Sequence, residues 1–330
     1  YIVMSKDILC YRFPNQEIAR ENGLFKEVSL TQNKIDGFVI TDFYKKKKFI
    51  FQSSQGFERK PFHLKKEIPY SITEQSYMDY ASMVLRLMPT LGVEKIVLSR
   101  IKSTLFSTDK AWALFEKLCS TYPKAFVYMA SSEYFGTWVG ASPETLLETH
   151  ADSGFTMSLA GTKEINSNTT WQKKEYAEQK FVTDYISNIL NEQEVASIEI
   201  NGPYTSPAGN IEHIRSDISF DLQKRKAADI ANALHPTPAV CGVPKKESFD
   251  LIETVELKDQ GYDRSLYCGY IGFVSEKMTK LYVNLRCCQL TENQAHIYVG
   301  GGYTSASTPE DEWEETERKS ETLSRIFDLL

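Results

Sequence analysis

Hydrophobic and polar positions alternate along this chain with two periods, and the clearest helical period lies near its end. From Thr308 onward one stripe recurs at steps of three or four residues, the spacing of one face of an α-helix. The stripe comprises Glu312, Glu315, Lys319, Leu323, Ile326 and Leu330. Thr308 and Pro309 are typical of an N-cap and a first turn, so we expect the helix to begin there. The lower part of the stripe is apolar, whereas the upper part carries carboxylates and an ammonium.

Ionisable groups on an otherwise apolar stripe conflict with the burial that the pattern predicts. Such groups are costly to bury unless they are paired or bound to a metal. A local conflict of this kind is expected at functional sites. The remaining charges of the helix are expected to be ordinary solvated groups; they are Glu314, Glu317, Arg318, Glu321 and Arg325.

The same conflict appears in a second predicted helix, from Trp171 to Leu190. Its inward stripe comprises Glu175, Glu178, Val182, Tyr185 and Ile189. Exposed glutamates paired with nearby lysines would be the simpler interpretation. Two glutamate pairs, each at the N-terminal end of an amphipathic helix, instead favour a metal site lined by carboxylates. Oxygen ligands without histidine or cysteine nearby favour Mg²⁺, which keeps several waters and shares itself with an anionic substrate.

Strand-like segments and turn signals dominate the rest of the chain. The predicted strands are Phe38–Tyr44, Phe49–Phe51, Lys95–Arg100, Ala125–Met129, Thr137–Val139, Phe155–Leu159, Val195–Ile200, Glu212–Ile218, Tyr267–Val274, Leu281–Leu290 and Ala295–Val299. Further helices are predicted over Thr73–Leu91, Asp109–Tyr122, Ala227–Leu234 and Ser248–Glu256. Turn signals stand at Asn22-Gly23 and Asp36-Gly37.

These elements predict an α+β fold, a single large domain of mostly antiparallel β-sheets with helices on the outside. No repeat, low-complexity tract or Pro/Ser-rich linker divides the chain. Strands gather toward the C-terminal end without regular βαβ alternation, which argues against a Rossmann-type fold. Gly300-Gly301-Gly302 does not match the GxGxxG pattern, so we expect no dinucleotide site.

Composition and charge exclude several classes of protein. Apolar residues make up 42% and charged residues 25%, and the net charge of −6 gives no electrostatic footprint for nucleic acid. Lys45–Lys48 separates two predicted strands and is expected to be a solvated hairpin turn. No apolar run is long enough to span a bilayer and no secretory signal is present, so we expect a cytoplasmic protein without membrane association. The scattered cysteines lack CxxC spacing and are expected to be reduced thiols.

Several stretches carry a resemblance to a known family. They are Gly140-Ala141-Ser142-Pro143-Glu144, Leu159–Thr162, Glu175–Gln179, His235–Val240, Arg264–Gly269, Asn284–Arg286 and Gly300–Lys319. In order and spacing they resemble the chorismate-utilising enzymes, which include isochorismate, salicylate, anthranilate and aminodeoxychorismate synthases. The resemblance covers residues 90–330, whereas residues 1–75 look divergent. It implies one chorismate-binding domain over residues 1–330, sheets packed face to face and flanked by helices, Mg²⁺ dependence, and chorismate as the substrate.

The resemblance also implies a set of site residues. Glu178 and Glu315 would touch the metal, with Glu175 and Glu312 holding its waters. The substrate-binding residues would be Gly161, Thr162, His213, Ala239, Tyr267, Arg286, Gly300, Gly302 and Lys319. Among them Arg286 offers a fork for the enolpyruvyl carboxylate, and the glycines let backbone N–H groups approach closely. Without the resemblance, Arg286 would be read as an ordinary strand salt bridge and Tyr267 as a core tyrosine.

Three positions separate the activities within the family. Lys95 resembles the members that activate water, because the ammonia-using members usually carry another residue there. Ala160 stands where the aminodeoxychorismate synthases place a nucleophilic lysine, and an alanine cannot attack the ring. Ala239-Val240 resembles the isochorismate synthases, whereas salicylate and anthranilate synthases tend to have threonine first. Together these positions favour water as the nucleophile.

Glu144 is the expected partner of Lys95 in catalysis. Partial burial would keep its carboxyl protonated. It would then donate a proton to the departing ring hydroxyl, while Lys95 takes a proton from water attacking two carbons away. In isolation Lys95 could equally be a strand-edge lysine whose ammonium reaches solvent. His213 is expected either to contact the leaving hydroxyl or to be a satisfied core histidine, and His235 to end a helix.

These residues predict an isochorismate synthase, an isomerase (hydroxymutase) that acts with Mg²⁺ in menaquinone or catecholate siderophore biosynthesis. The alternatives are a salicylate synthase, which would add pyruvate elimination, and a non-catalytic chorismate-binding protein. The water-using relatives need no amidotransferase, and the chain contains no glutaminase-like nucleophile motif. We therefore expect a monomer without a glutamine amidotransferase partner.

Overall fold

The computed structural model describes residues 6–30, 35–54, 56–165, 170–208 and 211–330. Within these ranges the strands join into one 16-stranded sheet. The strands are β1 (Asp7–Arg12), β2 (Ala19–Glu27), β3 (Gly37–Thr41), β4 (Lys48–Ser53), β5 (Lys95–Leu105), β6 (Phe126–Ser132), β7 (Gly136–Ser142), β8 (Thr145–His150), β9 (Ser153–Glu164), β10 (Ala196–Ala208), β11 (Ile211–Asp221), β12 (Gly242–Val243), β13 (Tyr270–Val274), β14 (Met278–Val283), β15 (Cys287–Leu290) and β16 (Gln294–Thr304).

Every pairing between these strands is antiparallel, which confirms the predicted α+β fold class. The order across the sheet is β10-β11-β9-β8-β14-β13-β3-β4-β2-β1-β6-β7-β15-β16-β5-β12. The N-terminal strands β1 to β4 therefore occupy the middle of the sheet. They separate a flank that contains β8, β9 and β11 from a flank that contains β7, β15, β16 and β5.

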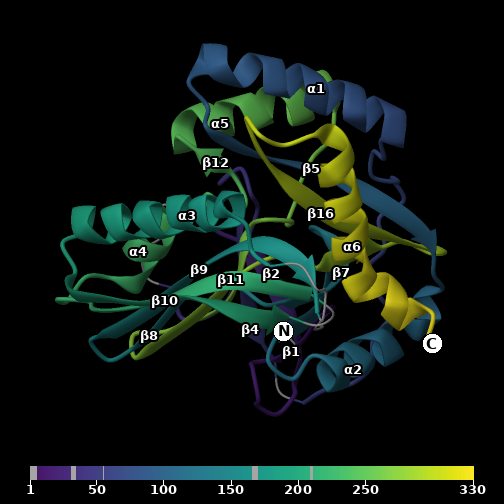
Figure 1. Ribbon diagram of the computed structural model, residues 1–330. Helices are drawn as coiled ribbons and strands as arrows, with labels where there is room; N and C mark the ends of the chain where they lie inside the picture. The colour runs from purple at the N-terminus through teal and green to yellow at the C-terminus, as the bar shows by residue number, and fades with distance from the viewer. Residues whose placement is uncertain (1–5, 31–34, 55, 166–169, 209–210) are drawn as a thin grey trace.

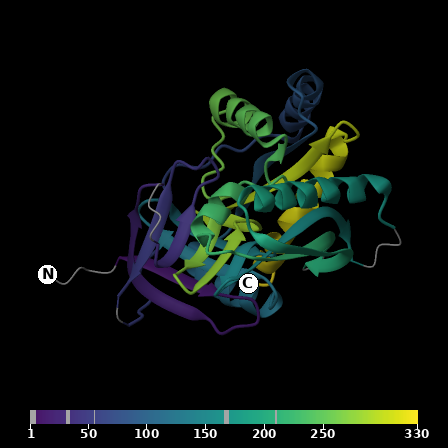
Figure 2. The same cartoon turned by 90° about the vertical axis from the view of Figure 1, so that its left-hand side faces the viewer.

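The helices pack outside the sheet in two groups. They are α1 (Glu74–Leu91), α2 (Ala111–Thr121), α3 (Lys173–Glu192), α4 (Ala227–Leu234), α5 (Lys245–Ile252) and α6 (Pro309–Phe327), with a 3₁₀ turn η1 (Thr108–Lys110) and a π-helix η2 (Glu253–Asp259). In Figures 1 and 2, α3 runs along β9 and β11, whereas α1, α5 and α6 gather around β5 and β16. The N-terminal ends of α3 and α6, which carry the paired glutamates, thus come from different flanks.

The predicted ends of two helices agree with the structure. Thr73 accepts a hydrogen bond from the Ser76 backbone N–H at the start of α1, and Gly92 ends α1 with φ +66°. Such a positive φ is adopted readily by glycine. Pro89 lies inside the last turn of α1 rather than ending it. Thr308 caps α6 by accepting a hydrogen bond from the Asp311 N–H, as predicted.

Several sequence-based expectations about individual elements were wrong. Asn22-Gly23 lies within β2, where Gly23 pairs with Ser53 of β4, and makes no turn; a Cβ on Gly23 would lie 2.1 Å from the Gln52 carbonyl oxygen. The glycine there permits close strand pairing. The predicted strand Leu281–Leu290 is divided between β14 and β15, with Asn284–Arg286 between them. The helix expected at Ser248 begins earlier, as α5, and continues as η2.

Two expectations about the faces of helices also differ in detail. The buried residues of α3 are Gln179, Val182, Ile186 and Leu190, so Tyr185 and Ile189 lie at the edge of the stripe. In α6, Glu317 is not an ordinary solvated charge. It forms ion pairs with Arg100 and, at 2.6 Å, with Lys102 of β5. This pairing ties α6 to β5, the strand that begins with Lys95.

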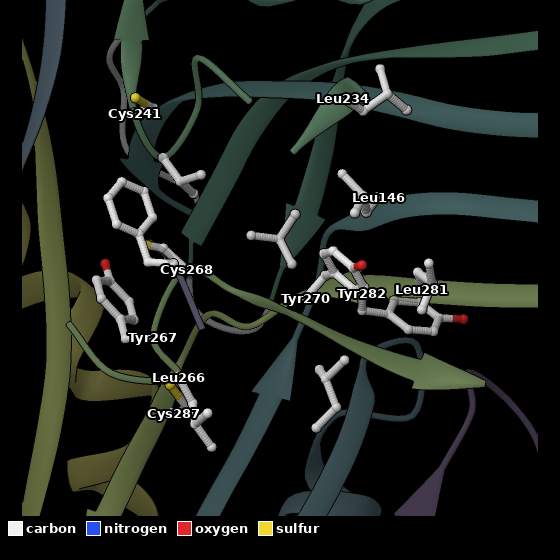
Figure 3. Packing of buried hydrophobic residues seen from close by; sticks show 14 of the residues in the cluster. Leu146, Leu234, Cys241, Leu266, Tyr267, Cys268, Tyr270, Leu281, Tyr282 and Cys287 are labelled. Atoms are coloured by element: carbon white, nitrogen blue, oxygen red, sulfur yellow. The ribbon is translucent and has the colours of Figure 1, made fainter. Parts of the chain in front are cut away.

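The core consists of two hydrophobic clusters, and β1 contributes Leu9 to the larger one and Ile8 and Cys10 to the smaller one. Leu146, Leu281 and Tyr282 from β8 and β14 belong to the larger cluster (Figure 3).

All six cysteines are buried free thiols, as expected. Lys45–Lys47 form the exposed turn between β3 and β4, but Lys48 is buried in β4 and donates to the Leu30 carbonyl. No helix in the described part of the chain is long and apolar enough to cross a membrane.

Candidate active site

A cavity of about 80 Å³ lies where the two flanks of the sheet meet under α3 and α6. The predicted site residues that line it are Lys95, Glu144, Gly161, Thr162, Glu178, His213, Ala239, Tyr267, Arg286, Gly300, Gly302, Glu315 and Lys319. Glu175 and Glu312 do not line it. The structure therefore gathers residues that are far apart in the sequence into one place.

Lys95 is the first residue of β5 and its side chain is 1% exposed. Its Nζ lies 2.9 Å from Glu178 Oε1 on α3, so this ion pair joins the two flanks across the cavity. Gly302 of β16 makes room for the pair. A Cβ at that position would lie 2.9 Å from Glu178 Oε1 and 3.3 Å from Lys95 Cε. A larger residue at the last glycine of the triplet would therefore displace the Glu178 carboxylate or the end of the Lys95 side chain.

Glu144 follows β7 at the turn into β8 and is 3% exposed. Its backbone is held from both sides, because its N–H donates to Ser142 Oγ and its carbonyl accepts from the Val283 N–H. Burial raises the pKa of its carboxyl to about 7, against the opposing effect of the positive charges on Lys95, Arg286 and Lys319. At neutral pH the carboxyl can therefore either hold or release a proton.

Arg286 lies in the break between β14 and β15 with a left-handed backbone, φ +49°. Non-glycine residues seldom adopt this conformation, and it is often found at functional sites. The guanidinium donates to the Lys319 carbonyl and to His213 Nε2, both at 3.3 Å. Because Arg286 can only donate, Nε2 is the acceptor, and His213 Nδ1 then donates to the Gly161 carbonyl at 2.6 Å.

His213 is therefore neutral and holds Arg286 in place. Burial, and then the charge of Arg286, lower the pKa of its ring to about 3. Both ring nitrogens have protein partners, as a satisfied core histidine would, yet the ring also lines the cavity. His235, by contrast, caps the end of α4 and lies outside the cavity, as predicted.

The carboxylates near α6 occupy different environments. Glu315 pairs with Lys319 Nζ at 2.6 Å, and the same ammonium donates to the Gly300 carbonyl at 2.8 Å. Glu312 is buried; its Oε1 accepts from Ser307 Oγ at 2.9 Å. Its Oε2 has no hydrogen-bond partner among the described residues. Burial and the negative charges of Glu315 and Glu178 raise the pKa of Glu312 to about 8, with Lys319 opposing the shift.

Glu175 has a local role in the helix start. Its Oε2 accepts from the Gln172 N–H at 2.7 Å, which completes a capping box at the first turn of α3. A Cβ on Gly161, which has φ +68°, would lie 3.4 Å from the Glu175 Cβ. Glu175 thus packs against the turn that carries Gly161 and Thr162, behind the cavity wall.

The donor set fits a hard divalent cation. Among the residues that the structure describes, no three His, Cys, Asp or Glu side chains already stand at coordinating separation. However, Glu178, Glu312 and Glu315 influence one another electrostatically, and one buried oxygen of Glu312 lacks a hydrogen bond. Carboxylate oxygens without soft ligands suit Mg²⁺, and the free oxygen of Glu312 could accept a hydrogen bond from a water bound to such a cation.

Sequence reasoning did not find the apolar walls or the support behind them. Val97 and Val299 line the cavity but resemble ordinary core residues in the sequence, and Leu159, Val240 and Leu285, which stand in the quoted motifs, were not predicted to line it. A completely buried ion pair, Arg264–Glu256, was also missed.

This buried pair connects walls of the cavity. Arg264 donates to Glu256 Oε2 at 2.6 Å, to the Val97 carbonyl at 2.6 Å and to the Val240 carbonyl at 2.9 Å. The Ser99 N–H donates to Glu256 Oε1 at 2.9 Å, which ties the pair to β5 again. Arg264 belongs to a stretch that the sequence marked without assigning it a role.

Comparison with known proteins now identifies the family. The family model described as "Chorismate binding enzyme" matches residues 20–328. Isochorismate synthase EntC of Escherichia coli strain K12 is 29% identical over 275 residues, which cover 78% of this chain and 69% of that enzyme. Isochorismate synthase MenF of Haemophilus influenzae is 26% identical over 80% of this chain and 64% of its own length. Anthranilate synthase component 1 of Saccharolobus solfataricus is 26% identical over 77% of this chain and 62% of its own length.

Solved structures show the same fold. The putative 2,3-dihydroxybenzoate-specific isochorismate synthase of Bacillus anthracis has a TM-score of 0.80 at 19% identity and covers 100% of this chain and 98% of its own. The menaquinone-specific isochorismate synthase MenF of Escherichia coli has a TM-score of 0.80 at 18% identity, covering 97% of this chain and 88% of its own. The match over almost the whole sequence, together with a cavity that collects the family's motif residues, leads to one conclusion: the chain belongs to the chorismate-binding enzyme family.

Proposed function

We propose that the protein is an isochorismate synthase that converts chorismate to isochorismate with Mg²⁺. The observation that carries the proposal is the pairing of a buried lysine, Lys95, with a buried carboxyl, Glu144, in one cavity. The pKa of that carboxyl, about 7, suits proton transfer at neutral pH. Ala160, which also lines the cavity, offers no nucleophile, so the attacking group is water.

Glu144 and Lys95 divide the proton transfers between them. Glu144 donates its proton to the ring hydroxyl that departs, and Lys95 accepts a proton from the water that attacks two carbons away. Transfers of this kind each contribute about 10²–10⁴-fold to the rate. Both side chains are shielded from bulk solvent, which favours direct transfer to the substrate over exchange with water.

Lys95 Nζ contacts Glu178 Oε1 at 2.9 Å, so the amine must leave this partner to reach the attacking water. Glu178 and Glu315, which face the cavity, are the residues that would hold Mg²⁺, with Glu312 and Glu175 behind them. When bound, the ion supplies positive charge for these carboxylates and for the ring carboxylate.

The second carboxylate of chorismate, on the enolpyruvyl group, needs hydrogen-bond donors. Arg286 and Lys319 supply charged donors at the cavity wall, and Tyr267 supplies a hydroxyl. Gly300 leaves room for that hydroxyl, since a Cβ there would lie 3.0 Å from Tyr267 Oη. Ala239 and the turn at Gly161-Thr162 complete the wall around the ring.

Incubation with chorismate and Mg²⁺, with the products resolved by NMR, tests the proposal. Isochorismate as the product, lost on addition of EDTA and recovered with excess Mg²⁺, is the expected result. Salicylate and pyruvate would instead assign the protein as a salicylate synthase. Binding of chorismate without any turnover would leave a non-catalytic chorismate-binding protein. Gel filtration with light scattering tests the expected monomer.

A further inference from the structure

A second cavity, of about 390 Å³, adjoins the candidate active site. The two cavities share Pro143, Leu159 and Arg286 as a common wall. The other walls come from the turn at residues 121–125, from Ala141, from Ser206, Pro207 and Arg215 of the β10–β11 hairpin, and from Thr322 of α6. None of these additional residues belongs to the set that the sequence predicted.

The charge of this cavity differs from that of the protein. Its lining includes three cationic side chains, Lys124, Arg215 and Arg286, and no acidic side chain of a described residue. The whole chain, by contrast, carries a net charge of −6. Asp217 pairs with Arg215 at 2.7 Å from outside the lining, so it offsets part of the charge while fixing the position of Arg215. A cavity of one sign concentrates ions of the opposite sign.

The walls are held in place by buried hydrogen bonds. The guanidinium of Arg12, which is buried, donates to the carbonyls of Tyr122, Pro123 and Ala125 at 2.6, 2.7 and 3.1 Å. The Tyr122 hydroxyl donates to the Thr322 carbonyl at 2.9 Å, which links this turn to α6. The turn therefore forms a fixed side of the cavity, in contrast to a loosely placed surface loop.

The second cavity is much larger than the first. Ligand sites commonly enclose about 300–1,000 Å³. The first cavity, at about 80 Å³, is well below this range, whereas the second, at about 390 Å³, falls within it. Between them Arg286 is held by two hydrogen bonds of 3.3 Å, near the long end for such contacts. Its guanidinium can therefore exchange these contacts for a carboxylate.

We propose that the second cavity is an anion-collecting antechamber, which binds one carboxylate of a small dicarboxylate substrate through Arg215 and Lys124 and passes it to Arg286. The inference rests on the proposed function for the identity of the substrate. It adds Arg215 and Lys124 to the substrate-binding residues, because they would bind the substrate before the chemical step.

The first test removes the charge. The double variant Lys124→Gln/Arg215→Gln is compared with Lys180→Gln/Arg225→Gln, which removes the same charge from ion pairs elsewhere on the surface. Two charges acting on a dianion at roughly 10 Å predict that KM for chorismate rises about fivefold at an ionic strength of about 0.02 M. At an ionic strength of about 0.5 M the increase in KM is less than about twofold, because salt screens the interaction. The control pair keeps the KM and salt dependence of the wild type.

The second test blocks the cavity without changing its charge. Ser206→Trp fills the space from the hairpin, with Ser219→Trp on the exposed part of β11 as the control. The first variant raises KM at every ionic strength, whereas the second leaves it unchanged. If the cavity variants and their controls have the same KM for chorismate, the antechamber is wrong. In that case turnover of chorismate to isochorismate by the wild type still supports the proposed function. A wild type that neither binds nor converts chorismate overturns both.

Discussion

Replacement of Glu144 by glutamine tests the acid role through two independent quantities, stability and rate. The amide keeps the size of the carboxyl but can neither ionise nor donate an acidic proton. In the folded protein, burial raises the pKa of Glu144 from its usual 4.5 to about 7. This rise in pKa corresponds to about 3 kcal/mol of the free energy of unfolding, which is lost when the carboxyl ionises in the folded protein.

The sign of the pH dependence follows from where the proton resides. Between pH 4.5 and about 7 the unfolded chain has lost the proton while the folded chain keeps it, so this group makes stability fall as the pH rises. Glu144→Gln removes that dependence. Relative to the wild type, the variant should therefore gain about 3 kcal/mol in the free energy of unfolding between pH 4.5 and pH 8.

Urea unfolding of both proteins across this pH range measures the difference. The same variant should lower kcat by about 10²–10⁴-fold, because the departing hydroxyl loses its proton donor. In the wild type, kcat should decline above pH 7 as Glu144 ionises. A stability difference between variant and wild type that stays constant with pH, or a variant with wild-type kcat, would refute the reasoning.

Three further substitutions probe the rest of the site. Lys95→Gln should lower kcat by about 10²–10⁴-fold with an unchanged circular dichroism spectrum; substantial residual turnover would exclude Lys95 as the base. Gly302→Ala places a methyl group 2.9 Å from Glu178 Oε1 and should raise the Mg²⁺ concentration needed for half-maximal rate; an unchanged metal titration would contradict the assignment of Glu178 to the metal. Arg264→Ala leaves Glu256 as a buried unpaired charge and should cost about 3–5 kcal/mol in urea unfolding; a loss below about 1 kcal/mol would show that the pair does not stabilise the fold.

Local patterns predicted the elements that carry the site. The stripe on α6 reveals both its buried lower part, Leu323 and Ile326, and the half-buried Glu315 and Lys319 above it. Helix periodicity is a local property, so a single sequence can show it. The same holds for Thr308 as the N-cap, since capping depends on a few neighbouring residues.

Long-range contacts escaped prediction for a physical reason. Nothing near Leu285 in the sequence shows that Arg286 has a left-handed backbone or that its partners are Ala141, His213 and Lys319, which are all distant in the sequence. The ion pair of Lys95 with Glu178 likewise joins residues from opposite flanks. The roles of the site residues stay predictions until the variants are measured, whereas their convergence is a property of the fold.

The position of β1 to β4 in the middle of the sheet has a consequence for how the enzyme forms. Synthesis delivers these strands before either flank, and each flank that bears half of the cavity must then attach to an opposite edge of them. The chain also crosses directly between the flanks, at Glu144 between β7 and β8 and at Arg286 between β14 and β15, so the central strands and these crossings together align Lys95 with Glu178. The N-terminal segment therefore acts as a spacer inside the sheet, and the family match over residues 20–328 includes most of it.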